Sequence, residues 1–219
     1  LQRPVVDEYV EILWHCIKRL WPGAKRRNES FRMMVTHDVD EPFRYAFRPA
    51  RKALRTFGGD LLRRHDVKSA FVNLTRWIDV KHLGNWQRDP SYTFELIMNI
   101  SESYNLQSTF YFLSGGGHAF DGNYFITHPL IKQLITKINA RGHEIGYHGS
   151  FETYRDHKKT KKEVDYLKKT IAMCGIDQAI SKGRQHYLRW VTPITWANYE
   201  KSYLKFDSTL SYADAAGFR

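Results

Sequence analysis

Two aspartates lie two positions apart after a short apolar run, in the segment THDVD at residues 36–40. Residues i and i+2 of an extended segment point to the same side, so both carboxylates can face one pocket. One can then ligate a divalent cation while the other serves as a general base. The commoner origin of an isolated pair of this kind is a surface turn or the cap of a following helix. Asp38 and Asp40 are therefore candidates that need support from other segments.

A second set of polar groups lies in GHEIGYHGSFE, residues 142–152. His148 follows a short apolar run, and Glu152 comes four residues later. Residues i and i+4 of a helical turn share a face, so the two side chains could hold one metal ion. The alternative is an ordinary histidine at the end of a strand and a glutamate in solvent.

The segment RQHYLRW, residues 184–190, supplies two arginines. A guanidinium beside a catalytic carboxylate keeps that carboxylate ionised and oriented. The alternative is a basic, solvated face. Neither a G-x-S-x-G elbow nor a phosphate-binding loop occurs, which argues against serine hydrolases of that type and against P-loop enzymes.

Alternating strands and helices would position these groups. Apolar runs predict strands, and a spacing of three to four predicts helices; the strands are 31–36, 109–113, 144–147, 187–191 and 204–206, and the helices 8–20, 91–98, 131–138, 164–171 and 195–203. This alternation predicts an α/β fold with a largely parallel sheet, open or barrel-like. The carboxyl ends of parallel strands meet at one rim, so the three segments should share it.

Composition bounds the remaining possibilities. The 219 residues are 42% hydrophobic and 15% aromatic, enough for a core, and no apolar run approaches the roughly 18 residues of a membrane span. Two distant cysteines predict neither a disulfide scaffold nor a zinc finger. The net charge of +11 favours a polyanionic partner, whether acidic glycan, nucleic acid or anionic lipid. The chain begins at Leu1 without an export-signal pattern, so we expect a cytoplasmic location.

Taken in order, five segments resemble the polysaccharide deacetylases of carbohydrate esterase family 4: VTHDVD at 35–40, STFYF at 108–112, GHEIGYHGS at 142–150, RQHYLRW at 184–190 and FDSTLSYAD at 206–214. The THDVD and HGSF forms are similar to a divergent subgroup associated with bacterial cell-surface glycan gene sets. The resemblance implies a distorted (β/α) barrel, a divalent metal (most often zinc), and removal of acetyl groups from N- or O-acetylated sugars. The expected partner is an acetylated glycan, not nucleic acid.

The resemblance also implies roles for individual residues. Asp38 matches the general base, and Asp40 takes the place of the metal-ligating aspartate through a shift of one residue. His148 matches the first metal histidine. The second metal histidine falls at Glu152, with Ser150 as a weaker candidate.

Arg189, or failing that Arg184, matches the arginine that orients the base. Aromatic side chains near the rim could stack on sugar rings; these are Tyr147, Phe151 and Trp190.

Two departures from the family pattern leave alternatives open. The second metal histidine is replaced, and no histidine follows His186 to act as general acid. We therefore expect the barrel to lack its C-terminal part. The predicted organisation is an N-terminal helical segment over 1–29 and a deacetylase-like domain over 30–219, with a basic insertion near 48–90. A catalytically inactive glycan-binding module on the same scaffold is the alternative function, and a nucleic-acid-binding protein, suggested by charge alone, is a third.

Overall fold

The computed structural model describes residues 2–27, 30, 32–211 and 216. Its centre is a parallel sheet of five strands that follow one another in chain order: β1 (Val35–Val39), β2 (Ser108–Leu113), β3 (Glu144–Gly149), β4 (Lys182–Gln185) and β5 (Phe206–Asp207). The described strands leave β1 and β5 as open edges. The α/β fold with a parallel sheet is thus confirmed.

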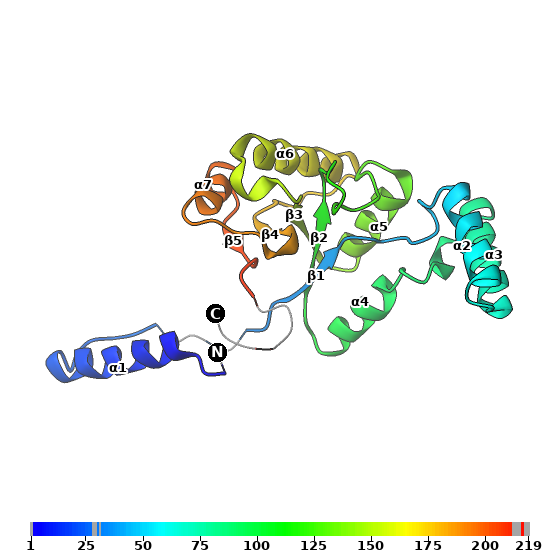
Figure 1. The fold of residues 1–219 in the computed structure, drawn as a ribbon. Helices are drawn as coiled ribbons and strands as arrows, with labels where there is room; N and C mark the ends of the chain where they lie inside the picture. Colours follow the sequence, from blue (N-terminus) through cyan, green and yellow to red (C-terminus); the bar gives the residue numbers. More distant parts are fainter. Residues whose placement is uncertain (1, 28–29, 31, 212–215, 217–219) are drawn as a thin grey trace.

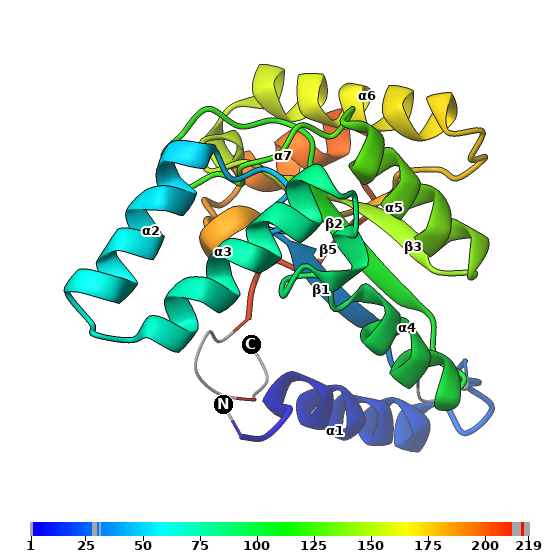
Figure 2. The ribbon, with the colours of Figure 1, turned by 90° about the vertical axis from the view of Figure 1, so that its right-hand side faces the viewer.

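Four helices cover one face of this sheet (Figures 1 and 2): α4 (Phe94–Ser103), α5 (Pro129–Ala140), α6 (His157–Met173) and α7 (Ile194–Lys201). Crossover connections between parallel strands are right-handed, so strands added in one direction place every connecting helix on the same side. The opposite face then lies on the inside of the curved sheet. Three short 3₁₀ turns complete the connections: Trp86–Arg88, Thr153–Arg155 and His186–Leu188.

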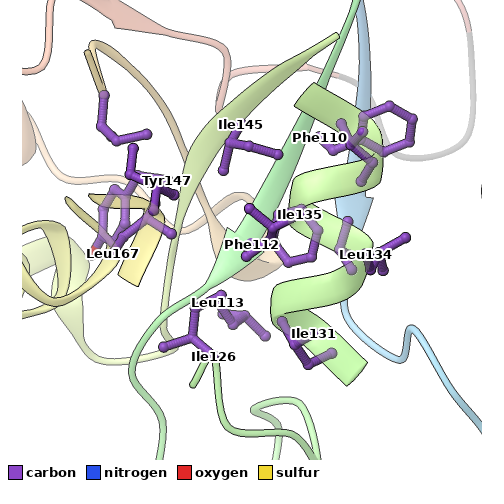
Figure 3. Close-up of a cluster of buried hydrophobic side chains, with 14 of the residues drawn as sticks. Phe110, Phe112, Leu113, Ile126, Ile131, Leu134, Ile135, Ile145, Tyr147 and Leu167 are labelled. Carbon is purple, nitrogen blue, oxygen red and sulfur yellow. The ribbon is translucent and has the colours of Figure 1, made fainter. Parts of the chain in front are cut away.

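The helix-covered face carries the main core, shown in Figure 3. Phe110 and Phe112 of β2 and Ile145 of β3 point toward α5, and all three side chains are no more than 2% exposed. The matching positions of α5 recur at three- to four-residue spacing and are also buried: Ile131, Leu134, Ile135 and Ile138. Burying one such side chain stabilises the fold by roughly 1.5–3 kcal/mol, so this layer holds the sheet and helices together.

The inner face of the sheet is polar instead. Thr109 of β2 donates a hydrogen bond to Glu144 of β3, and Lys182 of β4 forms an ion pair with the same carboxylate. Asp38 of β1 and Arg184 of β4 meet above this layer. Side chains alternate between the two faces along a strand, so each of these residues is the direct sequence neighbour of a residue that faces the core.

Two parts lie apart from the sheet in Figure 1. Helix α1 (Val5–Leu20) agrees with the predicted N-terminal helix and has no buried residue. Helices α2 (Ala50–Leu62) and α3 (Val67–His82) lie side by side in both views and occupy the basic stretch in which no element was predicted. Both helices bury few side chains, so their apolar positions do not show the helical spacing that would predict them from the sequence.

Three predicted strands are displaced. β1 starts four residues later than predicted, so Asp38 lies within the strand and Asp40 directly after it. The strand predicted over 187–191 is wrong: the chain forms β4 at Lys182–Gln185 and then a 3₁₀ turn. β5 covers Phe206–Asp207, where 204–206 was predicted. β4 was missed because its sequence, KGRQ, contains no apolar side chain.

Candidate metal centre

Three side chains from three strand ends converge on one point. His148 Nε2 lies 3.0 Å from His186 Nδ1, and Asp40 Oδ1 lies 3.2 Å and 3.4 Å from these two nitrogens. Asp40 follows β1, His148 belongs to β3, and His186 follows β4. Both imidazoles are buried, while half of the Asp40 side chain is exposed. Among the residues that the structure describes, these three could hold a metal ion.

The outer nitrogen of each imidazole is committed to a backbone carbonyl. His148 Nδ1 lies 3.0 Å from the carbonyl oxygen of Arg184, and His186 Nε2 lies 2.8 Å from that of Phe120. A carbonyl oxygen only accepts, so both outer nitrogens carry the proton. In the neutral rings the inner nitrogens, His148 Nε2 and His186 Nδ1, then direct two lone pairs at each other.

This arrangement fits a bound cation. Two lone pairs 3.0 Å apart, with a carboxylate oxygen beside them, repel one another unless a positive charge lies between them. Hydrogen bonds from the outer nitrogens of ligating histidines to carbonyl groups are the usual second layer of metal sites. Metal–nitrogen distances of roughly 2.0–2.1 Å at tetrahedral angles place ligand atoms about 3.3 Å apart, close to the separations found here.

Opposing influences act on Asp40. Burial would raise its pKa. When the two imidazoles are protonated, a hydrogen bond from His148 and the charges of both histidines outweigh burial and hold the pKa of Asp40 below its usual value. The loop between β2 and α5 lies against the same residue. A Cβ on Gly122 would come within 2.5 Å of the Asp40 carbonyl oxygen, so only glycine allows this approach. Tyr124 locks the contact, since its hydroxyl donates to the carbonyl of Val39 and accepts from the amide of Leu113.

Asp38 lies in the same cleft and is held by Arg184. The guanidinium donates to Asp38 Oδ1 at 2.9 Å, to Thr36 Oγ1 at 2.7 Å, and to the carbonyl oxygen of Ser208 at 2.9 Å. It also lies 5.1 Å above the ring of Tyr111. Arg184 is thus fixed on several sides, and it orients a carboxylate that is one-third exposed and free to accept a proton.

Glu152 and Arg189 pair with each other and not with Asp38 or Asp40. Glu152 Oε2 accepts from Arg155 at 3.0 Å, and Glu152 Oε1 accepts from Arg189 at 3.3 Å. The hydrogen bond from Arg155 lowers the pKa of Glu152 most, and Arg189 adds to it. The third converging side chain is His186, and the arginine at Asp38 is Arg184, the second of the two alternatives.

Of the three aromatic residues expected at the substrate, one lies beside the cleft. Tyr147 is fully buried on the helix-covered face and donates a hydrogen bond to Glu163 (Figure 3). Trp190 packs against Trp196 of α7, with ring centroids 5.7 Å apart. Phe151 lies beside the cleft and packs against the rings of Phe120 and Tyr187.

The metal centre opens into a cleft of about 390 Å³. Its lining combines carboxylates, two exposed aromatic rings and one of the histidines: Asp38, Asp40, Glu41, Phe120, Asp121, Gly122, Asn123, His186, Tyr187 and Leu188. A cleft of this size accommodates a small organic ligand. A ligand in this cleft would contact Asp40 and His186.

Strained backbone shapes one side of the cleft. Tyr187 and Leu188 have φ angles of 57° and 52°, in the left-handed region that residues with side chains avoid. Each such residue costs about 1–3 kcal/mol, and strain of this kind concentrates at functional sites. The turn places His186 at the metal centre and the Tyr187 ring beside it, with ring centroids 4.6 Å apart.

A buried glutamate ties together the loops beneath the site. Glu163 of α6 accepts from the hydroxyl and amide of Ser150 and from the hydroxyl of Tyr147. Burial raises its pKa, and these hydrogen bonds only partly oppose that shift. Gly115 is required here because a Cβ would lie 1.9 Å from the Glu163 carboxylate.

Sequence reasoning missed His186, Phe120 and Tyr187. The signal for His186 was present: in an extended R-x-H segment, Arg184 and His186 point to the same side. The apolar run points to a strand after His186, whereas β4 lies before it, and this displacement hides the signal. No comparable signal in the sequence points to Phe120.

Comparisons with known proteins add little. No protein-family model and no curated protein sequence matches the chain. Among solved structures, the chain is similar to the crystal structure of a protein from Mycobacterium smegmatis that is provisionally assigned as a polysaccharide deacetylase. The identity is 18% and the TM-score 0.44, over 81% of this chain and 50% of the other. The chain thus spans about half the length of that protein. Within the described residues, no helix is long and apolar enough to cross a membrane.

Proposed function

We propose that the chain is a metal-dependent hydrolase that removes acetyl groups from an acetylated sugar or cell-surface polysaccharide. The observation that carries this proposal is the pair of inward-facing imidazole lone pairs beside Asp40, with an oriented carboxylate, Asp38, in the same cleft. The order of the sequence motifs supports acetylated sugars as the substrate class. Glu152 is not part of the proposed ligand set, because its carboxylate pairs with two arginines.

Asp40, His148 and His186 would hold the metal. A set of three protein ligands with two histidines and one carboxylate is typical of catalytic zinc, so zinc is the proposed ion, although the same set also suits ferrous iron. When bound, the ion would polarise the acetyl carbonyl and lower the pKa of a water molecule.

The protein's own groups would handle the proton. Asp38 accepts it from the attacking water, because its carboxylate is exposed to the cleft and held by Arg184 through Oδ1. Arg184 holds the Asp38 carboxylate in place and prevents it from rotating away. The carbonyls of Arg184 and Phe120 keep the imidazoles in the tautomers that present their inner nitrogens.

Acetate release measured with and without added metal tests this function. Wild-type protein stripped of metal should release no acetate from an N-acetylglucosamine oligosaccharide, and stoichiometric zinc should restore release. Asp38→Asn should retain zinc and lose activity by at least about 100-fold, the typical contribution of a general base. Asp165→Asn, an exposed carboxylate paired with Lys161, is the matched control.

Each other outcome has a definite meaning. Zinc binding without acetate release from N- or O-acetylated sugars would indicate a different hydrolytic substrate. Sugar binding without metal binding would indicate the inactive glycan-binding module.

A further inference from the structure

Two exposed aromatic rings form a wall of the cleft. Phe120 and Tyr187 are 52% and 60% exposed, and their ring centroids lie 5.4 Å apart. Phe151 packs beneath both, at 5.1 Å and 5.6 Å, and is itself covered by the stacked ring of His118 at 4.2 Å. The exposed rings therefore rest on a packed second tier and are held in place. We refer to Phe120 and Tyr187 as the aromatic wall.

The aromatic wall is built into the metal centre. The carbonyl of Phe120 accepts the hydrogen bond that fixes the His186 tautomer, and Tyr187 directly follows His186. A ligand that stacks on these rings would consequently lie at a fixed distance from the metal. The strained turn at Tyr187 and Leu188 sets the direction of the Tyr187 ring.

The rest of the cleft is acidic, in contrast to the whole chain. Four carboxylates line it (Asp38, Asp40, Glu41 and Asp121), and its described lining includes no lysine or arginine. Arg184 neutralises Asp38 from below. The net charge of +11 lies elsewhere on the molecule. A bound dication would offset Asp40, which leaves Glu41 and Asp121 to repel an anionic group that enters the cleft. A neutral ligand with hydroxyl groups would instead find hydrogen-bond acceptors.

From the aromatic wall and the acidic lining beside it, we infer that the wall stacks one neutral pyranose ring and that the carboxylates exclude acidic sugars. The apolar C–H face of the ring covers Phe120 and Tyr187, its hydroxyl groups donate to the carboxylates, and its acetyl group reaches the metal centre. This inference rests on the proposed function and narrows it to neutral acetylated glycans, against the expectation from net charge.

Binding to two oligosaccharides tests the inference. We would use the metal-stripped wild-type protein, so that no turnover occurs and Asp38 still pairs with Arg184, and titrate it calorimetrically at roughly 0.15 M salt to screen long-range charge. The neutral probe is an N-acetylglucosamine tetramer. The acidic probe is a hyaluronan tetramer, in which the same acetylated sugar alternates with glucuronate. The neutral tetramer should bind at least 10-fold more tightly. Equal or tighter binding of the acidic probe would overturn the exclusion.

Variants of the wall test the stacking. In the same metal-stripped form, Phe120→Ala and Tyr187→Ala should each weaken binding of the neutral tetramer at least 10-fold, while Tyr187→Phe preserves it. Phe125→Ala, an exposed ring outside the cleft lining, is the matched control. Both wall residues are mostly exposed, so folding should survive, and retained zinc binding verifies this. An unchanged affinity in both alanine variants, or an equal loss in the control, would overturn the stacking role.

Glu41→Gln tests the acidic rim separately. It should strengthen hyaluronan binding several-fold and change binding of the neutral tetramer much less, because the glutamine amide oxygen still accepts hydrogen bonds. Unchanged hyaluronan binding would contradict the exclusion. Failure of the proposed function is a distinct result: the wild-type protein would release no acetate with zinc bound, whatever its sugar binding.

Discussion

The two faces of the sheet follow different rules although they are built from the same five strands. On the helix-covered face, neighbouring apolar side chains such as Phe110, Phe112 and Ile145 fill space and make few polar contacts. On the inner face, Asp38, Arg184 and their neighbours are joined by directed hydrogen bonds. The comparison shows that one face stabilises the fold and that the other face positions the side chains of the candidate site. Because side chains alternate along a strand, neighbouring residues belong to opposite faces.

The largest effect should come from the core face. Phe112→Ala removes a fully buried ring between β2 and α5 and should reduce the free energy of unfolding by about 3–5 kcal/mol, measured by urea denaturation. Tyr111 is the neighbouring residue on the other face. Tyr111→Phe removes only the hydrogen bond that Ser208 donates to the Tyr111 hydroxyl, and it should reduce the free energy of unfolding by about 0.5–1.5 kcal/mol. Similar costs for the two changes would break the distinction between the faces.

The metal centre should respond to His186 and not to Glu152. His186→Ala removes one of three converging ligands and should weaken zinc affinity by more than about 100-fold, beyond the usual cost of losing a supporting hydrogen bond. Glu152→Ala breaks two surface ion pairs and should leave zinc affinity unchanged. Competition with a chelator gives both affinities. The reverse pattern would restore Glu152 as the ligand.

Substitutions of Arg184 and Arg189 should differ in their effect on acetate release. Arg184→Gln releases Asp38 and should lower acetate release about 10- to 100-fold while zinc stays bound, because only the backbone carbonyl of Arg184 supports a ligand. Arg189→Gln disturbs the Phe151 carbonyl and Glu152 and should change turnover much less. If Arg189→Gln has the larger effect on turnover with Km unchanged, Arg189 is the residue that orients the base.

The smallest effect concerns Glu163, a buried polar group on the core side. Burial raises its pKa in the folded state, so the folded chain binds this proton more tightly than the unfolded chain. Its contribution to stability therefore falls as the pH rises from about 4.5 toward the folded value, and then levels off. Glu163→Gln should remove this slope from the difference between the two unfolding curves. If the free energies of unfolding of the wild type and of Glu163→Gln run parallel across pH 4–8, ionisation of Glu163 does not destabilise the fold.

The two faces also differ in how well the sequence predicts them. The α/β fold, β2, β3 and α5 follow from apolar runs and helical spacing, because packing on one face requires those patterns. β4 does not, since its core-facing positions are Gly183, which fits under Tyr199, and Gln185, which hydrogen-bonds to neighbouring side chains.

The same reason explains the outcome at the site. Asp40 and His148 follow strands that periodicity could locate, and the structure brings them together. His186 follows the strand that periodicity does not locate, and the spacing of the resembling family places the expected second histidine at Glu152 instead. Directed contacts between strands 146 residues apart, such as Arg184 with Asp38, leave no trace in local patterning.

The chain-order arrangement of the strands has a further consequence for how the protein folds. Each strand pairs with the one synthesised before it, so the sheet can grow from its amino-terminal edge without waiting for a distant partner. The candidate metal centre is different, because it joins residues that follow β1 and β4 and forms only when His186 has emerged. Contacts this distant in sequence pay the largest loop-closure entropy and form late. During synthesis, the capacity to hold a metal ion would therefore appear only after β1 to β4 have emerged, when α5 and α6 can already pack on the sheet.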